Sequence, residues 1–75
     1  MRWKNLAKAL EWYKKAADYG DAEAQYTLGR AYEFGEGVKT DLDKAIRWYG
    51  KAAAQGDEKA KTAVADLIAD LAQEQ

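Results

Sequence analysis

The chain of 75 residues carries 12 basic and 13 acidic side chains, which leave a formal net charge of −1. It contains no cysteine and no histidine, which excludes disulfides, thiol nucleophiles, cysteine-based zinc sites and histidine general bases. No stretch approaches the roughly 20 apolar residues of a membrane span, and the first residues lack the apolar core of a signal peptide. We therefore expect one soluble domain over residues 1–75, without a targeting segment and cytoplasmic on expression.

Glycines divide the chain into four segments with helical patterns. Gly20, the pair Gly35 and Gly37, and Gly56 each follow such a segment, where the left-handed backbone of a helix C-terminus favours glycine. No segment alternates between apolar and polar residues over the length of a strand. The sequence therefore predicts an all-α fold, with helices over Arg2–Tyr19, Ala22–Phe34, Asp41–Gln55 and Glu58–Gln73.

The residues that precede three of these helices predict how each one begins. Asp21 and Asp57 each stand directly after a glycine and directly before a helical pattern, as N-cap residues do. Thr40 opens the segment Thr40-Asp41-Leu42-Asp43, a version of the capping box with aspartate in the place of glutamate. We expect Asp21, Thr40 and Asp57 to be the N-caps.

Apolar residues recur at helical spacing and predict the buried face of each helix. These residues are Leu6, Ala9, Leu10, Tyr13, Ala16 and Ala17 in the first helix, Ala24, Leu28, Ala31 and Tyr32 in the second, Leu42, Ala45, Ile46, Tyr49, Ala52 and Ala53 in the third, and Ala60, Ala63, Val64, Leu67, Ile68, Leu71 and Ala72 in the fourth. Tyr13 and Tyr49 are thus expected in the core. Trp12 and Trp48 lie one position off the stripe, which indicates helices packed on two sides.

The chain repeats itself at an offset of 36 residues. Residues 9–24 align with residues 45–60 and share nine identities in sixteen positions, among them Trp12 with Trp48 and Tyr13 with Tyr49. A repeat that contains two helices buries its faces by stacking on its neighbours. We therefore predict four antiparallel helices arranged as two stacked helix-turn-helix repeats.

The repeated segments resemble a known family. Ala9-Leu10-Glu11-Trp12-Tyr13-Lys14-Lys15-Ala16-Ala17, followed by Gly20-Asp21-Ala22-Glu23-Ala24-Gln25-Tyr26-Thr27-Leu28-Gly29, is similar to a Sel-one-like repeat, a relative of the tetratricopeptide repeats. The pattern continues from residue 31 to residue 56, through Trp48-Tyr49 and Lys51-Ala52-Ala53. The resemblance implies a tetratricopeptide-like fold and an adaptor scaffold that binds other proteins, rather than an enzyme.

Both ends of the chain depart from the repeat pattern. The first repeat has only its second helix, and Val64-Ala65-Asp66-Leu67-Ile68 stands where the pattern has Leu28-Gly29-Arg30-Ala31-Tyr32. These departures, together with the absence of proline, cysteine and histidine, indicate a scaffold closed on purpose at both ends. Our first hypothesis is thus an engineered or recombined scaffold without catalytic activity or a native ligand. The alternative is a natural Sel-one-like adaptor fragment that mediates protein–protein interaction.

Other motifs have a chemical interpretation beside a simpler structural one. The loop Gly35–Thr40 lacks the strand and the glycine-lysine step of a phosphate loop, so a helix-to-helix turn is favoured. The pairs Asp41 with Asp43 and Asp66 with Asp70 are the residue type of a cation site, but a first helical turn and a solvated face explain them. We expect no metal, no cofactor and no small-molecule ligand.

Charge differs between the two ends of the chain. Residues 1–20 carry five basic and two acidic side chains, and residues 56–75 carry two basic and five acidic ones. The first and last helices could attract each other within one molecule or head-to-tail between molecules. Lys14, Lys15 and Lys51 beside the Trp-Tyr pairs suggest base stacking, but nucleic-acid modules carry a basic excess that this chain lacks, so nucleic acid and membrane are not expected partners.

Short peptides bind to helix-pair repeats on the face lined by the first helix of each repeat. In this chain that helix is Ala22–Phe34, and its polar residues off the apolar stripe are Gln25, Arg30 and Glu33. These three form the predicted partner-binding face, for which a peptide or helix of another protein, or weak self-association, is expected. Their simpler interpretation is a solvated helix surface.

Overall fold

Four helices joined by short turns make up the described part of the chain. The computed structural model describes the backbone of residues 2–73 and the side chains of residues 6–73. The helices are α1 (Arg2–Asp18), α2 (Ala22–Phe34), α3 (Leu42–Ala54) and α4 (Glu58–Gln73). Each boundary lies within one residue of its predicted position, and residues 2–73 contain no strand, so the predicted all-α fold of helix pairs is confirmed.

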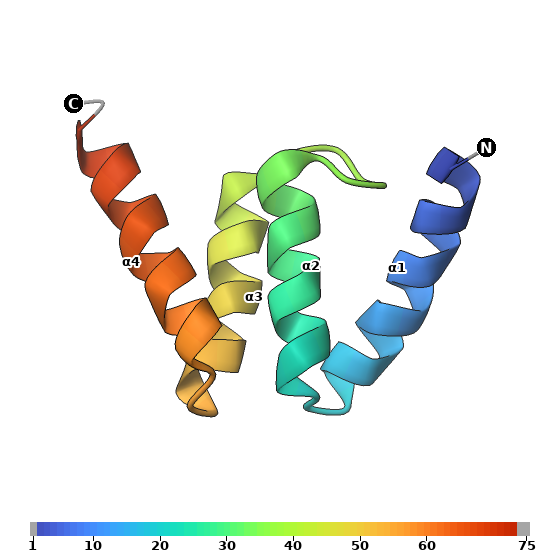
Figure 1. Ribbon diagram of the computed structural model, residues 1–75, viewed down its shortest axis with the longest axis horizontal. Coiled ribbons are helices and arrows are strands. Elements are labelled where there is room, and N and C mark those ends of the chain that lie inside the picture. Colours follow the sequence, from blue (N-terminus) through green and yellow to red (C-terminus); the bar gives the residue numbers. More distant parts are fainter. Residues whose placement is uncertain (1, 74–75) are drawn as a thin grey trace.

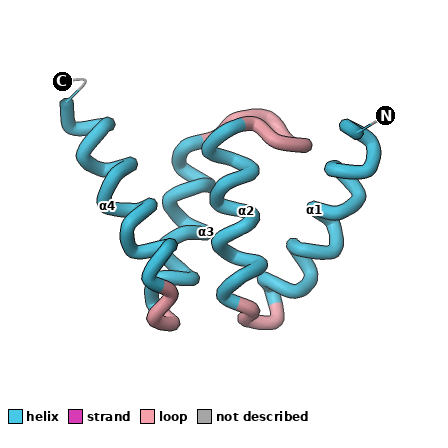
Figure 2. Tube along the Cα trace, viewed as in Figure 1, coloured by secondary structure: helices cyan, strands magenta, loops and turns pink. Residues whose placement is uncertain are grey.

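Consecutive helices run antiparallel and stand side by side in one row (Figure 1). The connections alternate between the two edges of this row (Figure 2). The row measures 37 × 26 × 15 Å, and α1 and α4 lie at its opposite ends. The first and last helices therefore do not close on each other. The basic first helix and the acidic last helix are also too far apart to attract each other within one molecule.

Glycines and aspartates end and begin the helices largely as predicted. Gly20 and Gly56 follow α1 and α3 with φ values of 100° and 95°, a backbone conformation that other residues rarely adopt. The Asp21 carboxylate accepts hydrogen bonds from the backbone N–H groups of Glu23 and Ala24, at 2.9 and 3.2 Å. Asp57 accepts one from Ala60 N at 3.2 Å. Each carboxylate thus satisfies amides that the first turn leaves without a partner.

The N-cap of α3 is Asp41 and not Thr40, so this detail of the prediction is wrong by one residue. The Asp41 carboxylate accepts a hydrogen bond from Lys44 N at 3.1 Å. The Thr40 hydroxyl instead lies against Gly35, 2.6 Å from the position that a Cβ atom would take there. Asp41 N donates to Tyr32 O at 2.9 Å. This bond to the end of α2 holds the turn and starts the helix one residue later.

Two clusters of buried side chains form the core. The first joins α1 to α2 and consists of Leu10, Ala17, Ala24, Leu28 and Ala31. The second joins α3 to α4 through Ala45, Tyr49 and Leu67, with Tyr26 and Tyr32 of α2 packed against them. Alanine dominates the contact faces, because its small side chain lets helix backbones approach closely. Tyr49 is the largest side chain that is fully buried, at 1% exposure.

Tyr49 joins α3 to α2 through three contacts. Its ring lies so close to Gly29 that a Cβ atom there would be 2.5 Å from Tyr49 Cδ1. The rings of Tyr26 and Tyr49 are tilted relative to each other, with centroids 5.5 Å apart, an arrangement that aromatic pairs favour. The Tyr49 hydroxyl donates a 2.7 Å hydrogen bond to Glu33 Oε1. Burial and this bond to a carboxylate raise the pKa of Tyr49 far above its ordinary value.

The helices at the two ends of the row expose residues that the stripes placed in the core. Tyr13 is 41% exposed and Trp12 is 72% exposed, whereas their repeat equivalents Tyr49 and Trp48 are buried and half-buried. On α4, Ile68 is also exposed. α3 packs between α2 and α4, but α1 contacts only α2 extensively. The prediction that Tyr13 lies in the core and that α1 packs on two sides is therefore wrong. α1 stands at the end of the row, whereas α3 has a neighbouring helix on each side.

Truncation of the two equivalent tyrosines should give unequal losses of stability. Tyr49→Ala removes a fully buried ring and should cost about 3–5 kcal/mol of unfolding free energy. Tyr13→Ala is the matched control and should cost less than about 1.5 kcal/mol, because that ring is partly in solvent. Urea unfolding followed by circular dichroism measures both values. Equal losses in the two variants would contradict the packing described.

Two helical glycines should respond in opposite directions to alanine. Gly29→Ala should destabilise by about 1–3 kcal/mol, because the new methyl group overlaps the Tyr49 ring. Gly50→Ala meets no atom within 4 Å and should stabilise by about 0.5–1 kcal/mol, because alanine favours the helix. Thermal unfolding of both variants tests this contrast. A Gly29→Ala variant as stable as Gly50→Ala would show that the ring does not rest on Gly29.

Stability should fall at high pH because the pKa of the buried Tyr49 hydroxyl is raised by folding. The unfolded side chain loses its proton near the ordinary pKa of 10.0, whereas the folded one keeps it. Its stabilising effect is thus complete below pH 10 and declines above it, by about 1.4 kcal/mol per pH unit. Unfolding free energies at pH 9 to 11.5, measured for the parent and for Tyr49→Phe, isolate this slope. Parallel pH profiles would refute it.

Candidate functional site

A groove lies between α2 and α4, with α3 as its floor. Its cavity of about 350 Å³ is lined by Tyr26, Arg30, Glu33 and Phe34 of α2, Tyr49 of α3, and Lys59, Thr62, Ala63 and Asp66 of α4. On each wall these residues recur three, four and seven positions apart, which places them on one helix face. The two walls thus present matching faces to the same space.

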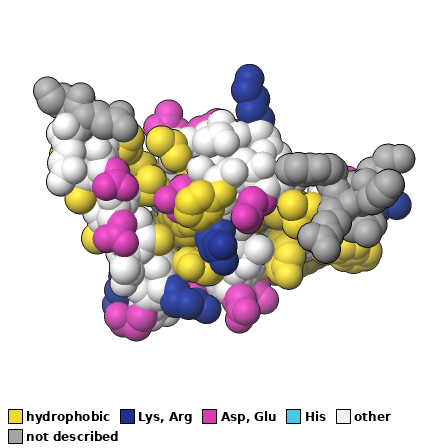
Figure 3. All heavy atoms as spheres, turned by 45° about the horizontal axis from the view of Figure 1, so that its top comes forward, with side chains coloured by type: hydrophobic (Ala, Val, Ile, Leu, Met, Phe, Trp, Pro, Cys, Tyr) yellow, Lys and Arg dark blue, Asp and Glu magenta, His cyan; other side chains and the backbone are white. Residues whose placement is uncertain are grey.

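Charges of both signs line this groove. Arg30 and Lys59 supply cations, and Glu33 and Asp66 supply carboxylates. Each cation lies over an aromatic ring, Arg30 at 5.9 Å from the centroid of Phe34 and Lys59 at 5.1 Å from that of Tyr26. Figure 3 likewise shows hydrophobic, basic and acidic side chains close together at the centre of the face it draws. The ring contacts position the cations while their hydrogen-bond donors stay available.

The charged side chains of the groove do not pair with one another. Within the described part of the chain the salt bridge is that of Lys61 with Glu58, two neighbours on the outside of α4. Glu33 accepts the Tyr49 hydroxyl, which fixes one carboxylate oxygen. The groove therefore presents charges whose partners have to come from another molecule or from solvent.

Two of the three residues predicted for the partner-binding face lie in this groove. Arg30 is exposed and Glu33 is half-buried, and both line the cavity. Gln25 does not, because only 5% of it is exposed. Its Nε2 donates to Ala17 O at 3.0 Å, and its Oε1 accepts from Gln55 Nε2 at 3.0 Å. Gln25 thus links the ends of α1, α2 and α3. It is buried and does not belong to the exposed partner-binding face that the sequence predicted.

Sequence reasoning missed the wall that α4 provides. Thr62 and Asp66 stand 36 residues after Tyr26 and Arg30, so the repeat offset places them at equivalent positions of α4, the corresponding helix of the next repeat. This offset is the signal that identifies the second wall, although the residue types differ between the two helices. Asp66, which was weighed as part of an acidic pair with Asp70, is thus a groove residue.

The remaining sequence candidates take structural places. The loop from Gly35 to Thr40 is a turn between α2 and α3, and residues 6–73 bring together no group of three acidic side chains suited to a metal ion. Lys15 lies over the Trp12 ring at 5.2 Å, whereas Lys14 and Lys51 line a separate pocket. None of the described helices has the length and apolar character that crossing a membrane requires.

Comparisons with known proteins agree with this architecture. The Sel1 repeat model matches residues 4–21 and residues 22–57, and the second range contains the α2–α3 pair. The chain is similar to the crystal structure of a Sel1 repeat protein from Oxalobacter formigenes, with 51% identity and a TM-score of 0.79 over 81% of this chain and 46% of that one. It thus spans just under half the length of that protein. No curated protein matches it.

The family model and the solved structure each match more than half of the chain. They confirm the resemblance to Sel-one-like repeats that the Trp-Tyr and Gly-Asp segments carry. The chain belongs to the Sel1 repeat family.

Proposed function

We propose that this chain is a protein-interaction module and that the groove between α2 and α4 binds a peptide or helical segment of another protein. Sel1 repeats are typically protein-interaction repeats. The observation that carries the proposal is the pair Arg30 and Asp66, which occupy equivalent positions of successive repeats and line one groove with opposite charges. A segment with charges in the reverse order is complementary to it.

The shape of the groove also supports a peptide rather than a reaction substrate. The cavity is open along the two helix faces. Its α2 wall combines the rings of Tyr26 and Phe34 with charged groups, whereas its α4 wall carries Lys59, Thr62, Ala63 and Asp66. Such a surface offers apolar contact from Tyr26 and Phe34 and charge pairing from the flanking side chains. The Tyr49 hydroxyl lies beside the Glu33 carboxylate, but it is buried and its pKa is raised, which makes it a poor nucleophile. We therefore propose no catalytic activity for the groove.

Family membership is equally compatible with our first hypothesis, an engineered or recombined scaffold without a native ligand. The two proposals differ in one measurable property. An adaptor groove selects particular peptide sequences through its charges, whereas the surface of a scaffold without a ligand selects none.

A peptide display library screened against the purified chain tests the proposal. We expect selected peptides whose binding is lost at least tenfold in the double variant Arg30→Glu with Asp66→Lys, because both charges of the groove are reversed. The matched control is Lys8→Glu with Asp18→Lys on α1, which keeps the same net charge and should bind as the parent does. Failure to select any peptide, or an equal loss of binding in the control variant, would contradict the adaptor groove and favour the scaffold hypothesis.

A further inference from the structure

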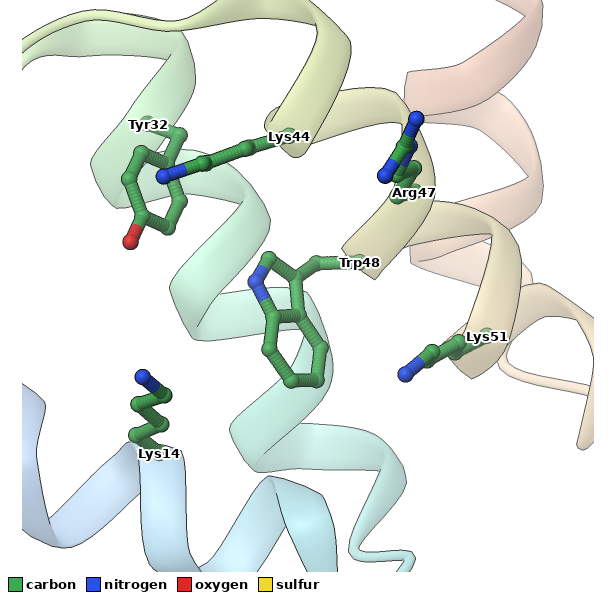
Figure 4. Close-up of a pocket in the computed structure, with 6 residues that line it drawn as sticks. All are labelled: Lys14, Tyr32, Lys44, Arg47, Trp48 and Lys51. Atoms are coloured by element: carbon green, nitrogen blue, oxygen red, sulfur yellow. The ribbon is translucent and has the colours of Figure 1, made fainter.

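A second groove lies between α1 and α3, with α2 as its floor. One cavity in it, of about 250 Å³, is lined by Lys14 of α1, Tyr32 of α2, and Lys44, Arg47, Trp48 and Lys51 of α3. Figure 4 shows the Trp48 ring extending from α3 into the space between these helices, with the four cationic side chains around it. This cavity shares no residue with the groove between α2 and α4.

Two of the four cations of this cavity lie over aromatic rings. The Lys44 ammonium lies 5.4 Å from the centroid of the Tyr32 ring, and the Lys51 ammonium lies 4.7 Å from that of Trp48. Trp48 is itself half-buried against the first core cluster, so its position is fixed. Because Lys51 already lies over the indole ring, this ring is not a free surface for stacking a nucleic-acid base.

The positive charge of this cavity has no acidic counterpart among the residues that line it. None of the six lining residues is acidic, and the salt bridge between Lys61 and Glu58 lies on α4. Four cations gather here in a chain whose net charge is −1. Three of them, Lys44, Arg47 and Lys51, lie on α3, where the seven steps from residue 44 to residue 51 correspond to about 10 Å of helix. This arrangement suits an extended ligand with several negative charges better than a single small anion.

A mainly apolar cavity continues the groove. It has a volume of about 260 Å³, and Lys14 and Glu11 are its charged lining residues beside the uncharged Ala7, Leu10, Leu28, Tyr32, Gly37 and Val38. Lys14 and Tyr32 line both cavities, so the two are adjoining parts of one groove. A ligand that fills the whole groove therefore carries negative charges at one end and an apolar group at the other, which is a property of a peptide and not of an inorganic polyphosphate.

We propose that the groove between α1 and α3 is a second binding site, which accepts an acidic peptide segment. Carboxylates of the segment pair with Lys44, Arg47 and Lys51, and an apolar side chain next to them enters the cavity beside Leu10 and Val38. Lys14 closes the site from α1. This site is independent of the one proposed between α2 and α4, because the two use different helix faces.

The test uses a fluorescein-labelled eight-residue peptide with glutamates at six positions and leucines at two, and measures its anisotropy with the purified chain. We expect binding that weakens as salt rises, because the ion pairs are near the surface. The variant Lys44→Glu with Lys51→Glu should bind at least tenfold more weakly. The milder Lys44→Gln with Lys51→Gln should show a smaller loss, and circular dichroism verifies that both variants are folded.

The matched control is Lys8→Glu with Lys61→Glu, which changes the net charge equally at two residues that line neither groove and should keep the affinity within about twofold of the parent. A peptide with serine in place of both leucines should bind more weakly. Absence of binding to the parent, or equal losses in the site and control variants, would overturn the proposal. A separate variant, Lys59→Glu, reports on the other groove. If it loses binding and the variant at Lys44 and Lys51 does not, the peptide occupies the groove between α2 and α4, which overturns this site and not the other.

Competition distinguishes the class of ligand. Sodium tripolyphosphate and a single-stranded oligonucleotide carry comparable charge but lack an apolar side chain for the adjoining cavity. Both should compete more weakly than the unlabelled peptide at equal charge concentration. Displacement by either at a lower concentration than the unlabelled peptide would overturn the assignment to a peptide and assign the cations to phosphate.

Discussion

The arrangement of the helices depends on the contact between Tyr49 and Gly29. A large ring in α3 rests on a position of α2 that has no side chain, and the alanines around it bring the two helices close together. The Tyr49 hydroxyl meets its hydrogen-bond requirement through Glu33, a carboxylate at the border of the core and the groove. One side chain therefore sets the spacing of the α2–α3 pair and fixes a charged group of the candidate site.

The alternation of helices along the row produces two grooves from one packing arrangement. Each groove is bounded by two helices that are not consecutive and has the intervening helix as its floor. Trp48 and Tyr49 are adjacent in sequence and point to different sides of α3. Trp48 extends into the groove between α1 and α3, and Tyr49 forms part of the floor of the groove between α2 and α4. The two residues of the Trp-Tyr pair thus line two different grooves.

The position of a helix in the row decides how a repeated residue is used. Tyr13 and Trp12 are identical to Tyr49 and Trp48 at the repeat offset, yet they are far more exposed. The difference does not come from α1 itself, which has the same apolar spacing as α3. It comes from the number of neighbours, because α3 has a helix on each side.

Local patterns in the sequence determined the four helices, most of their caps, the buried stripe of α3 and the repeat that identifies the family. These features depend on residues within one or two helical turns, or on similarity between two segments. The tertiary structure alone decided that Tyr13 is exposed, that Gln25 is buried between helix ends, and that Lys14 joins Lys51 in a basic cavity. Periodicity indicates which face of a helix is apolar, but the helix that covers that face is set by contacts distant in sequence.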